Sequence, residues 1–269
     1  MKSTYFFLLF CGIFFFSCNK NPLEKVWIYN ADPSKEQMEQ SKAYGRDIDI
    51  KYTPANFINI KEDGSYTAYL KNFSEGKWFL KEQNLVLVNK DRIITEFELH
   101  SNVGNKLVLS NKMKRLVYHF DGYPNDFGKE EDNPFAAVNN QWRLKSRHKE
   151  SDKELAARIK NHLHFWKQYF AWGHKKSIGY LDVRSTPSLL KLYGNGMEME
   201  YYDNLLPEWK NTYYDSTDCR IAYEMLYYKM HEKDVKWLDT KNKFERLASA
   251  FAQMEKWMDE KPSSYIRRK

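Results

Sequence analysis

The spacing of apolar residues changes once along the chain, and this change constrains the fold more than any other feature. Up to about residue 121, short runs such as Ile93–Leu99 alternate apolar and polar residues, and tight turns separate the runs. Beyond residues 122–133, apolar residues recur every three or four positions, at Leu155, Ile159, Leu163, Trp166 and Phe170. Side chains alternate across a strand but return to one face of a helix after about 3.6 residues. A β-structure followed by a helical structure is therefore predicted.

The β-structure is predicted to contain seven or eight short strands between residues 24 and 121. Asp63-Gly64 lies between two strand-like runs, and this dipeptide is a strong signal for a hairpin turn. Glu75-Gly76 precedes another strand in the same way. Many short strands joined by tight turns are typical of an antiparallel sandwich or barrel.

One set of positions runs through this whole part of the chain: Trp27, Phe57, Asp63, Gly64, Tyr66, Glu75, Gly76, Trp78, Leu85, Leu87, Phe97, Leu107 and Leu109. The pattern is similar to that of the small lipocalin-like domains of bacterial lipoproteins, where it marks successive strands. The resemblance implies a lipocalin-like antiparallel meander β-barrel over residues 23–121, with an interior core or pocket. It does not imply a particular ligand.

Residues 122–133 are polar and rich in turn residues, which indicates a linker. Residues 134–269 are predicted to form a small α-helical domain, in which Ser151 and Glu154 have the spacing of a capping box. Further helices are predicted over residues 186–193, 217–232 and 241–259. The expected fold class is thus α+β and multidomain, with the meander barrel first and the helical domain second.

The first residues have the proportions of an export signal. Lys2 is followed by an apolar stretch, Tyr5–Phe16, which is shorter than the about 20 residues that a membrane-spanning helix needs. A small residue, Ser17, then precedes Cys18. This site resembles the lipobox of bacterial lipoproteins, although Phe15 stands where leucine is usual.

The lipobox resemblance implies cleavage before Cys18 and lipid on that cysteine. We therefore expect a lipoprotein signal peptide over residues 1–17 and a lipidated tether over residues 18–22. The alternative is an ordinary secretory signal with an incidental cysteine. Because the sequence after Cys18 begins with Asn19 and Lys20, and not with acidic residues, we expect an anchor that faces the periplasm of a Gram-negative envelope.

Charge is distributed unevenly over the mature chain. The part from Cys18 to Asp132 has 17 basic and 18 acidic residues, whereas the part from Asn133 to Lys269 has 25 and 18. This asymmetry supports a boundary near residue 130. A lipidated Cys18 would leave Cys219 alone, so no disulfide within the chain is expected.

The main electrostatic feature is a basic run made of Arg143, Lys145, Arg147 and Lys149. A second basic group, Arg267–Lys269, ends the chain. Outside the cytoplasm, anionic lipids or acidic glycans are the expected counterparts, and nucleic acid is not. The alternative is a solvated basic face without a specific partner.

Other candidate groups have less specific patterns. His162, His164 and His174 are candidate metal ligands. His162 and His164 are two residues apart, however, so on a helix they do not share a face and cannot chelate a metal as an i,i+4 pair would. Cys219 could be a nucleophile, but a small buried cysteine is the preferred interpretation. A cluster of three acids, Glu198, Glu200 and Asp203, could hydrolyse glycosides or be a solvated segment. We predict no catalytic, cofactor-binding or metal site.

These features favour a membrane-anchored cell-envelope lipoprotein that acts as a binding or interaction module. The barrel would bind a small amphipathic ligand or serve as a scaffold. One alternative is an envelope enzyme of the hydrolase type, with its site in the helical domain or at the domain junction. Another is a structural subunit of an envelope complex. An open apolar cavity in the barrel would favour ligand binding, and a cleft that gathers acids or histidines would favour an enzyme. A filled barrel together with an exposed aromatic patch would favour a partner protein.

Cys18→Ser should abolish lipid attachment, because only the thiol of the cysteine can carry the thioether-linked lipid. We expect either unprocessed precursor or a form without lipid. Metabolic labelling with a fatty acid measures this directly. Equal labelling of the variant and the parent chain would show that Cys18 is not the anchor.

Overall fold

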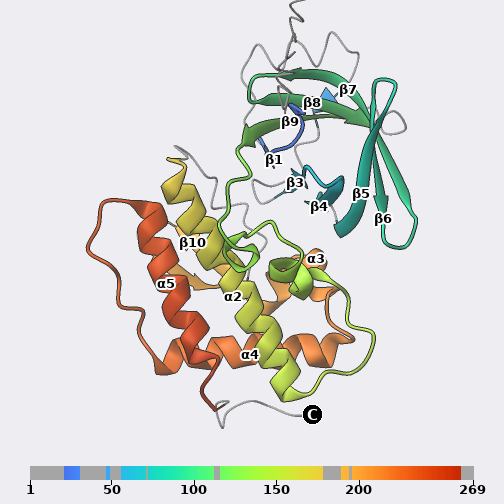
Figure 1. The fold of residues 1–269 in the computed structure, drawn as a ribbon. Coiled ribbons are helices and arrows are strands. Elements are labelled where there is room, and N and C mark those ends of the chain that lie inside the picture. Colours follow the sequence, from blue (N-terminus) through green and yellow to red (C-terminus); the bar gives the residue numbers. More distant parts are fainter. Residues whose placement is uncertain are drawn as a thin grey trace, which may run out of the picture.

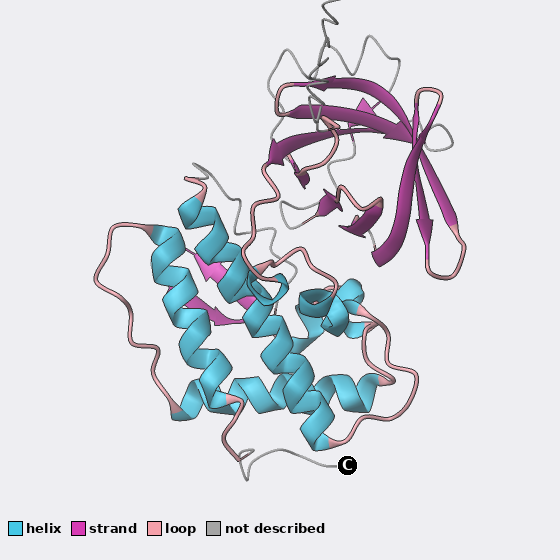
Figure 2. Cartoon of the chain, in the orientation of Figure 1, coloured by secondary structure: helices cyan, strands magenta, loops and turns pink. Residues whose placement is uncertain are grey.

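The computed structural model describes residues 21–30, 47–48, 56–70, 72–111, 116–177, 189–193 and 196–261. The strands gather in one part of the molecule and the helices in another, joined through a loop after β9 (Figure 1; Figure 2). Several predicted features lie outside the described residues: the signal peptide, Cys18 and the basic end Arg267–Lys269.

The first part is a closed barrel of eight antiparallel strands in meander order. The strands are β1 Val26–Tyr29, β3 Phe57–Ile60, β4 Ser65–Tyr69, β5 Phe73–Lys81, β6 Asn84–Asn89, β7 Ile94–Val103, β8 Lys106–Asn111 and β9 Leu116–Tyr123. Pairing of β1 with β9, from Val26 opposite Tyr123 to Tyr29 opposite Phe120, closes the barrel. A short strand, β2 Asp47–Ile48, adds to β9 in parallel. The predicted meander barrel is confirmed, and it is consistent with a lipocalin-like fold.

Glycines occupy two positions of the barrel where another residue would not fit easily. Gly64, in the predicted turn between β3 and β4, has φ +75°, a backbone region that favours glycine. Gly76 in β5 approaches the neighbouring strand so closely that a Cβ atom would lie 2.0 Å from the carbonyl oxygen of Val88. The two glycines of the predicted pattern therefore have steric reasons to be there.

The barrel interior is packed with apolar side chains. One hydrophobic cluster fills it, and each of its buried members is at most 3 % exposed. The cluster comprises Leu23, Trp27, Tyr29, Ile58, Ile60, Tyr66, Ala68, Leu85, Leu87, Phe97, Leu107, Leu109, Tyr118 and Phe120. The lipocalin-like resemblance implies either a core or a pocket inside the barrel, and these side chains form a core.

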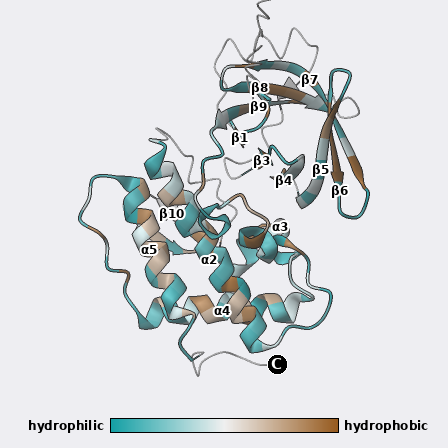
Figure 3. Ribbon diagram, in the orientation of Figure 1, coloured by the Kyte–Doolittle hydropathy of each residue, from teal (hydrophilic) through white to brown (hydrophobic). Residues whose placement is uncertain are grey.

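As far as the structure describes it, the helical part contains short 3-10 turns, four α-helices and one two-stranded hairpin. The bounds of the turns and helices are η1 Glu130–Asp132, η2 Val138–Arg143, α2 Asp152–Lys175, η4 Tyr202–Asn204, α3 Pro207–Lys210, α4 Ser216–Glu232 and α5 Lys243–Trp257. The capping box of Ser151 and Glu154 is present at the start of α2, as predicted. Hydrophobic and hydrophilic residues are interspersed along α2 and α5 (Figure 3), as expected for amphipathic helices with one buried face.

The two parts share a hydrophobic cluster. Outward-facing residues of the barrel, among them Phe57, Tyr69 and Phe73, are buried together with residues of η2, α2, α4 and α5. The segment after β9 belongs to this contact, because Phe135 packs edge-on against Phe57 with ring centroids 5.0 Å apart. The hydroxyl of Thr67 also donates a hydrogen bond to the carbonyl of Phe135.

The helix predicted over residues 186–193 is wrong where the structure describes it. Leu190–Tyr193 is strand β10, which pairs with β11, Gly196–Met199, in an antiparallel hairpin. Gly194 can end a helix, but Gly194-Asn195 is also a two-residue hairpin signal. The apolar residues before it are too few to separate a helical period from an alternating one.

Candidate functional site

The predicted basic run is divided between the surface and the interior. Lys145, Arg147 and Lys149 are exposed in the loop between η2 and α2. None of the three forms an ion pair with an acidic residue that the structure describes. Arg143 is only 7 % exposed, so the prediction that it contacts an external partner beside the other three needs correction. It ends η2, and its side chain turns into the shared cluster.

The guanidinium of Arg143 lies among aromatic rings from both parts of the molecule. Its central carbon is 3.8 Å from the ring centre of Tyr69 in β4, 4.2 Å from that of Trp142 and 4.6 Å from that of Phe165 in α2. Its Nε atom donates a hydrogen bond to Asn140 Oδ1 over 2.9 Å. Desolvated cation–π contacts are worth about 2 kcal/mol or more, and here they connect the barrel wall to the helices.

This cation has no carboxylate partner among the residues that the structure describes. Its Nη2 atom is buried and has no hydrogen-bond partner there. Burial lowers the pKa of Arg143 to about 10, although the hydroxyl of Tyr69 opposes this effect. Arg143 therefore stays protonated at neutral pH and leaves a positive charge inside the protein.

Next to Arg143, the imidazole of His162 is also buried. Its ring meets that of Trp142 edge-on with centroids 4.4 Å apart. Burial, together with the charge of Arg143, lowers the pKa of His162 to about 3. His162 is therefore neutral at physiological pH.

A pocket of about 370 Å³ adjoins this cluster. It is lined by Asn72, Phe73, Arg143, Leu144, Lys145, Pro207, Asn211 and Thr212. Two of the lining residues are cations and none is acidic. The backbone N–H of Ser146 donates a hydrogen bond to the Thr212 carbonyl over 2.8 Å, which ties the basic segment to the loop after α3.

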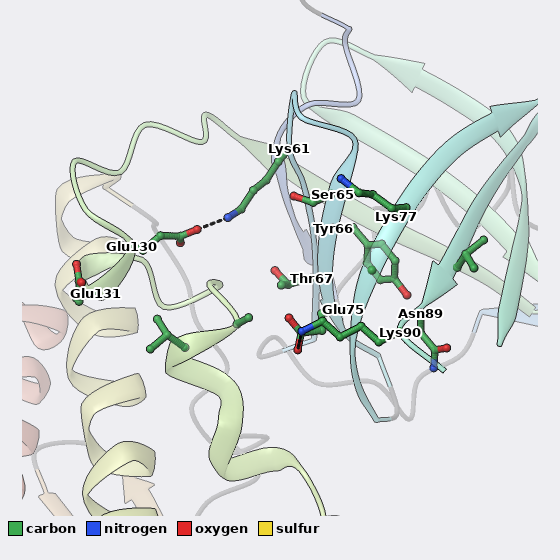
Figure 4. A pocket seen from close by; sticks show the side chains of 14 residues that line it. Lys61, Ser65, Tyr66, Thr67, Glu75, Lys77, Asn89, Lys90, Glu130 and Glu131 are labelled. Atoms are coloured by element: carbon green, nitrogen blue, oxygen red, sulfur yellow. Dashed lines mark hydrogen bonds and ion pairs between the residues drawn. The ribbon is translucent and has the colours of Figure 1, made fainter. Parts of the chain in front are cut away.

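A second, larger cleft of about 630 Å³ lies between the barrel wall and the η1–η2 segment. Figure 4 shows Lys61 reaching from the barrel toward Glu130 of η1, with which it forms an ion pair. Glu75 is paired with Lys90 at 2.7 Å. Three glutamates line the cleft, Glu75, Glu130 and Glu131, as the enzyme alternative requires. Glu75 and Glu130, however, form ion pairs with lysines.

A serine–histidine pair that no pattern in the sequence indicated occurs on the outer wall of β7 and β8. Ser110 Oγ lies 2.7 Å from His100 Nε2, and Glu98 Oε2 lies 3.8 Å from the same ring nitrogen. A catalytic triad needs its carboxylate on the opposite nitrogen, and Ser110 is fully buried. Among the residues that the structure describes, the arrangement is therefore not that of a hydrolase triad. Only strand register brings these residues together, so no local motif could have revealed them.

The three histidines considered for a metal site point to different surroundings. His162 is buried, His164 Nδ1 lies 2.9 Å from Glu255 Oε1, and His174 is exposed. Among the described residues, no group of three His, Cys, Asp or Glu side chains is placed to hold a metal ion.

Cys219 is 1 % exposed, and burial raises the pKa of its thiol, which confirms the interpretation as a buried cysteine. In the acidic cluster, Glu198 and Asp203 are exposed. Glu200 accepts hydrogen bonds from the backbone of Tyr201 and the side chain of Asn204, so its carboxylate serves a local turn.

Comparison of the chain with models of known protein families, with curated proteins and with solved structures finds no match. Within the described ranges, no helix combines the length and the apolar character that crossing a bilayer requires.

His162 should make the stability of the protein depend on pH. Its pKa is 6.5 ordinarily and about 3 in the folded protein, so between these values the unfolded chain binds a proton that the folded chain does not. In the middle of this range, the contribution of His162 to the free energy of unfolding should fall by about 1.4 kcal/mol for each unit of decreasing pH. Urea unfolding from pH 7 to pH 4 measures this.

His162→Gln should lose this part of the pH dependence. The matched control is His148→Gln, because the side chain of His148 is 68 % exposed, and it should keep the parent slope. Identical slopes for His162→Gln and the parent chain would contradict a neutral, buried His162.

Proposed function

We propose that the chain is a cell-envelope lipoprotein that acts as an interaction module. Lipid on Cys18 anchors it, facing the periplasm, and the exposed basic segment of Lys145, Arg147 and Lys149 binds an anionic membrane surface. The observation that carries the proposal is that these three cations are exposed and unpaired among the described residues. The packed interior of the barrel favours a scaffold over a container for a ligand.

The charge of the basic segment supports an anionic membrane surface as the partner. Each basic side chain near an anionic surface contributes about 1 kcal/mol. The attraction decays over a Debye length of about 8 Å at physiological salt. Three such contacts give weak, salt-sensitive binding by themselves. The lipid anchor strengthens that binding, because it keeps the basic segment at a high effective concentration near the membrane.

The tether allows the barrel to lie close to the membrane. Leu23 is already part of the barrel core, so only residues 18–22 separate the proposed anchor from the folded body. Five extended residues span roughly 17 Å. The anchor thus restricts how far the basic segment can move from the lipid surface.

A structural subunit of an envelope complex is the second candidate, and it rests on a different surface. On the barrel, Phe79, Ile93 and Ile94 are 47 %, 62 % and 64 % exposed. Exposed apolar side chains beside a packed core fit a protein partner. This candidate does not need the basic segment, so the same experiment separates the two.

We expect the chain from Asn19, without lipid, to co-sediment with vesicles of phosphatidylglycerol at low salt. Replacing Lys145, Arg147 and Lys149 together by Gln should remove most of this binding, by about 3 kcal/mol at the upper limit. The matched control replaces three exposed lysines elsewhere, Lys81, Lys191 and Lys241, and should bind better than the first variant. At about 0.5 M salt all three proteins should bind equally poorly.

Absence of binding at low salt, or equal binding by both triple variants, would contradict a role for the basic segment at membranes. Binding to polygalacturonate without binding to vesicles would replace the lipid surface by an acidic glycan as the partner.

A further inference from the structure

The pocket beside Arg143 differs from the exposed basic segment in both shape and surroundings. It is a concave site of about 370 Å³, and ligand pockets measure about 300–1,000 Å³. Its lining residues include two cations, Arg143 and Lys145, and two asparagines, Asn72 and Asn211, but no acidic residue. All of its charged groups are therefore positive.

Arg143 adds an unbalanced charge to this pocket. A buried cation is costly unless opposite charge or hydrogen bonds compensate it. The rings of Tyr69, Trp142 and Phe165 and the amide oxygen of Asn140 compensate part of that cost. No described carboxylate supplies the remainder, and Nη2 has no partner. A negative group in the adjoining pocket would interact with this charge through the poorly screened interior.

Three of the four remaining lining residues are apolar: Phe73 is buried, Leu144 is 40 % exposed, and Pro207 is the third. The fourth is Thr212, whose hydroxyl donates a hydrogen bond to the Trp209 carbonyl over 2.8 Å. An anion that fills the pocket would therefore place its acid group near the cations and amides and a compact apolar body against the three apolar side chains.

We propose that this pocket binds a small organic anion, with its acid group held by Lys145 and the amides of Asn72 and Asn211 in the field of Arg143. The site goes beyond the membrane contact proposed above and does not depend on it, since only Lys145 belongs to both. The required chemistry is a carboxylate or a phosphate monoester on a body of about the size of a benzene ring.

Phenyl phosphate and benzoate are suitable probes of this chemistry, and benzyl alcohol and benzylamine are the neutral and cationic controls. We expect at least one of the two anions to raise the melting temperature of the chain from Asn19, because a ligand that binds only the folded state stabilises it. Isothermal titration calorimetry then gives the Kd. The controls should cause no shift at the same concentration and ionic strength.

Variants locate the site. Lys145→Gln should raise the Kd about fivefold, as loss of an ion pair of about 1 kcal/mol implies. Asn211→Leu removes an amide and fills space in the pocket, so it should weaken binding further. Lys149→Gln removes the same charge outside the pocket and should leave the Kd unchanged. Circular dichroism establishes that each variant is folded.

No shift with either anion, or equal shifts with benzylamine, would overturn the proposal. Equal losses for Lys145→Gln and Lys149→Gln would also overturn it, because they would indicate general attraction to a basic surface. Vesicle binding by a variant with only Arg147 and Lys149 replaced reports on the membrane proposal alone, so failure of one proposal is distinguishable from failure of the other.

Discussion

An aromatic contact packs the outer wall of the barrel against the helical part and joins the two in one shared core. Phe135 stands at its centre, with ring centroids 5.0 Å from Phe57 in the barrel and 4.8 Å from Trp172 in α2. Without this contact, the outward-facing apolar residues of β1, β3, β4 and β5 would be exposed. Buried aromatic pairs each add about 0.5–1.5 kcal/mol beyond the area they bury, and no disulfide joins the described parts.

The same contact determines where functional groups can lie. The inner face of the barrel wall packs in the barrel's own core, and part of the outer face packs against the helices. Cations remain at the edge of the contact, where η2 leads into α2. There Arg143 enters the interior and Lys145, Arg147 and Lys149 stay outside. The exposed basic segment and the small positive pocket therefore both lie at the edge of the contact between the barrel and the helices.

Local patterns in the sequence predicted most of the fold. Alternation of apolar residues located the strands, and the capping box at Ser151 located the start of α2. The hairpin at Leu190–Tyr193 was missed because a four-residue strand contains too few residues for its period to be read. The barrel core could be expected, but sequence alternation cannot separate a filled interior from an open one.

The candidate site was predicted only in part. The basic run has a spacing of two residues, like side chains on one face of a strand: Arg143, Lys145, Arg147 and Lys149. Arg143, however, ends a 3-10 helix and its side chain turns inward. The pocket combines Asn72 and Asn211 with residues 143–145, and no spacing in the sequence indicates that these segments meet. Tertiary contact alone brings them together.

We propose that the barrel is a packed scaffold and that binding occurs on its outside. Titration of the chain with Nile red, an uncharged lipophile, distinguishes a packed interior from an open one, because such a probe has no affinity for the basic segment. We expect no saturable binding that hexadecanol can displace. Saturable binding of one Nile red per chain, displaced by hexadecanol, would instead show an open interior that takes up an apolar ligand.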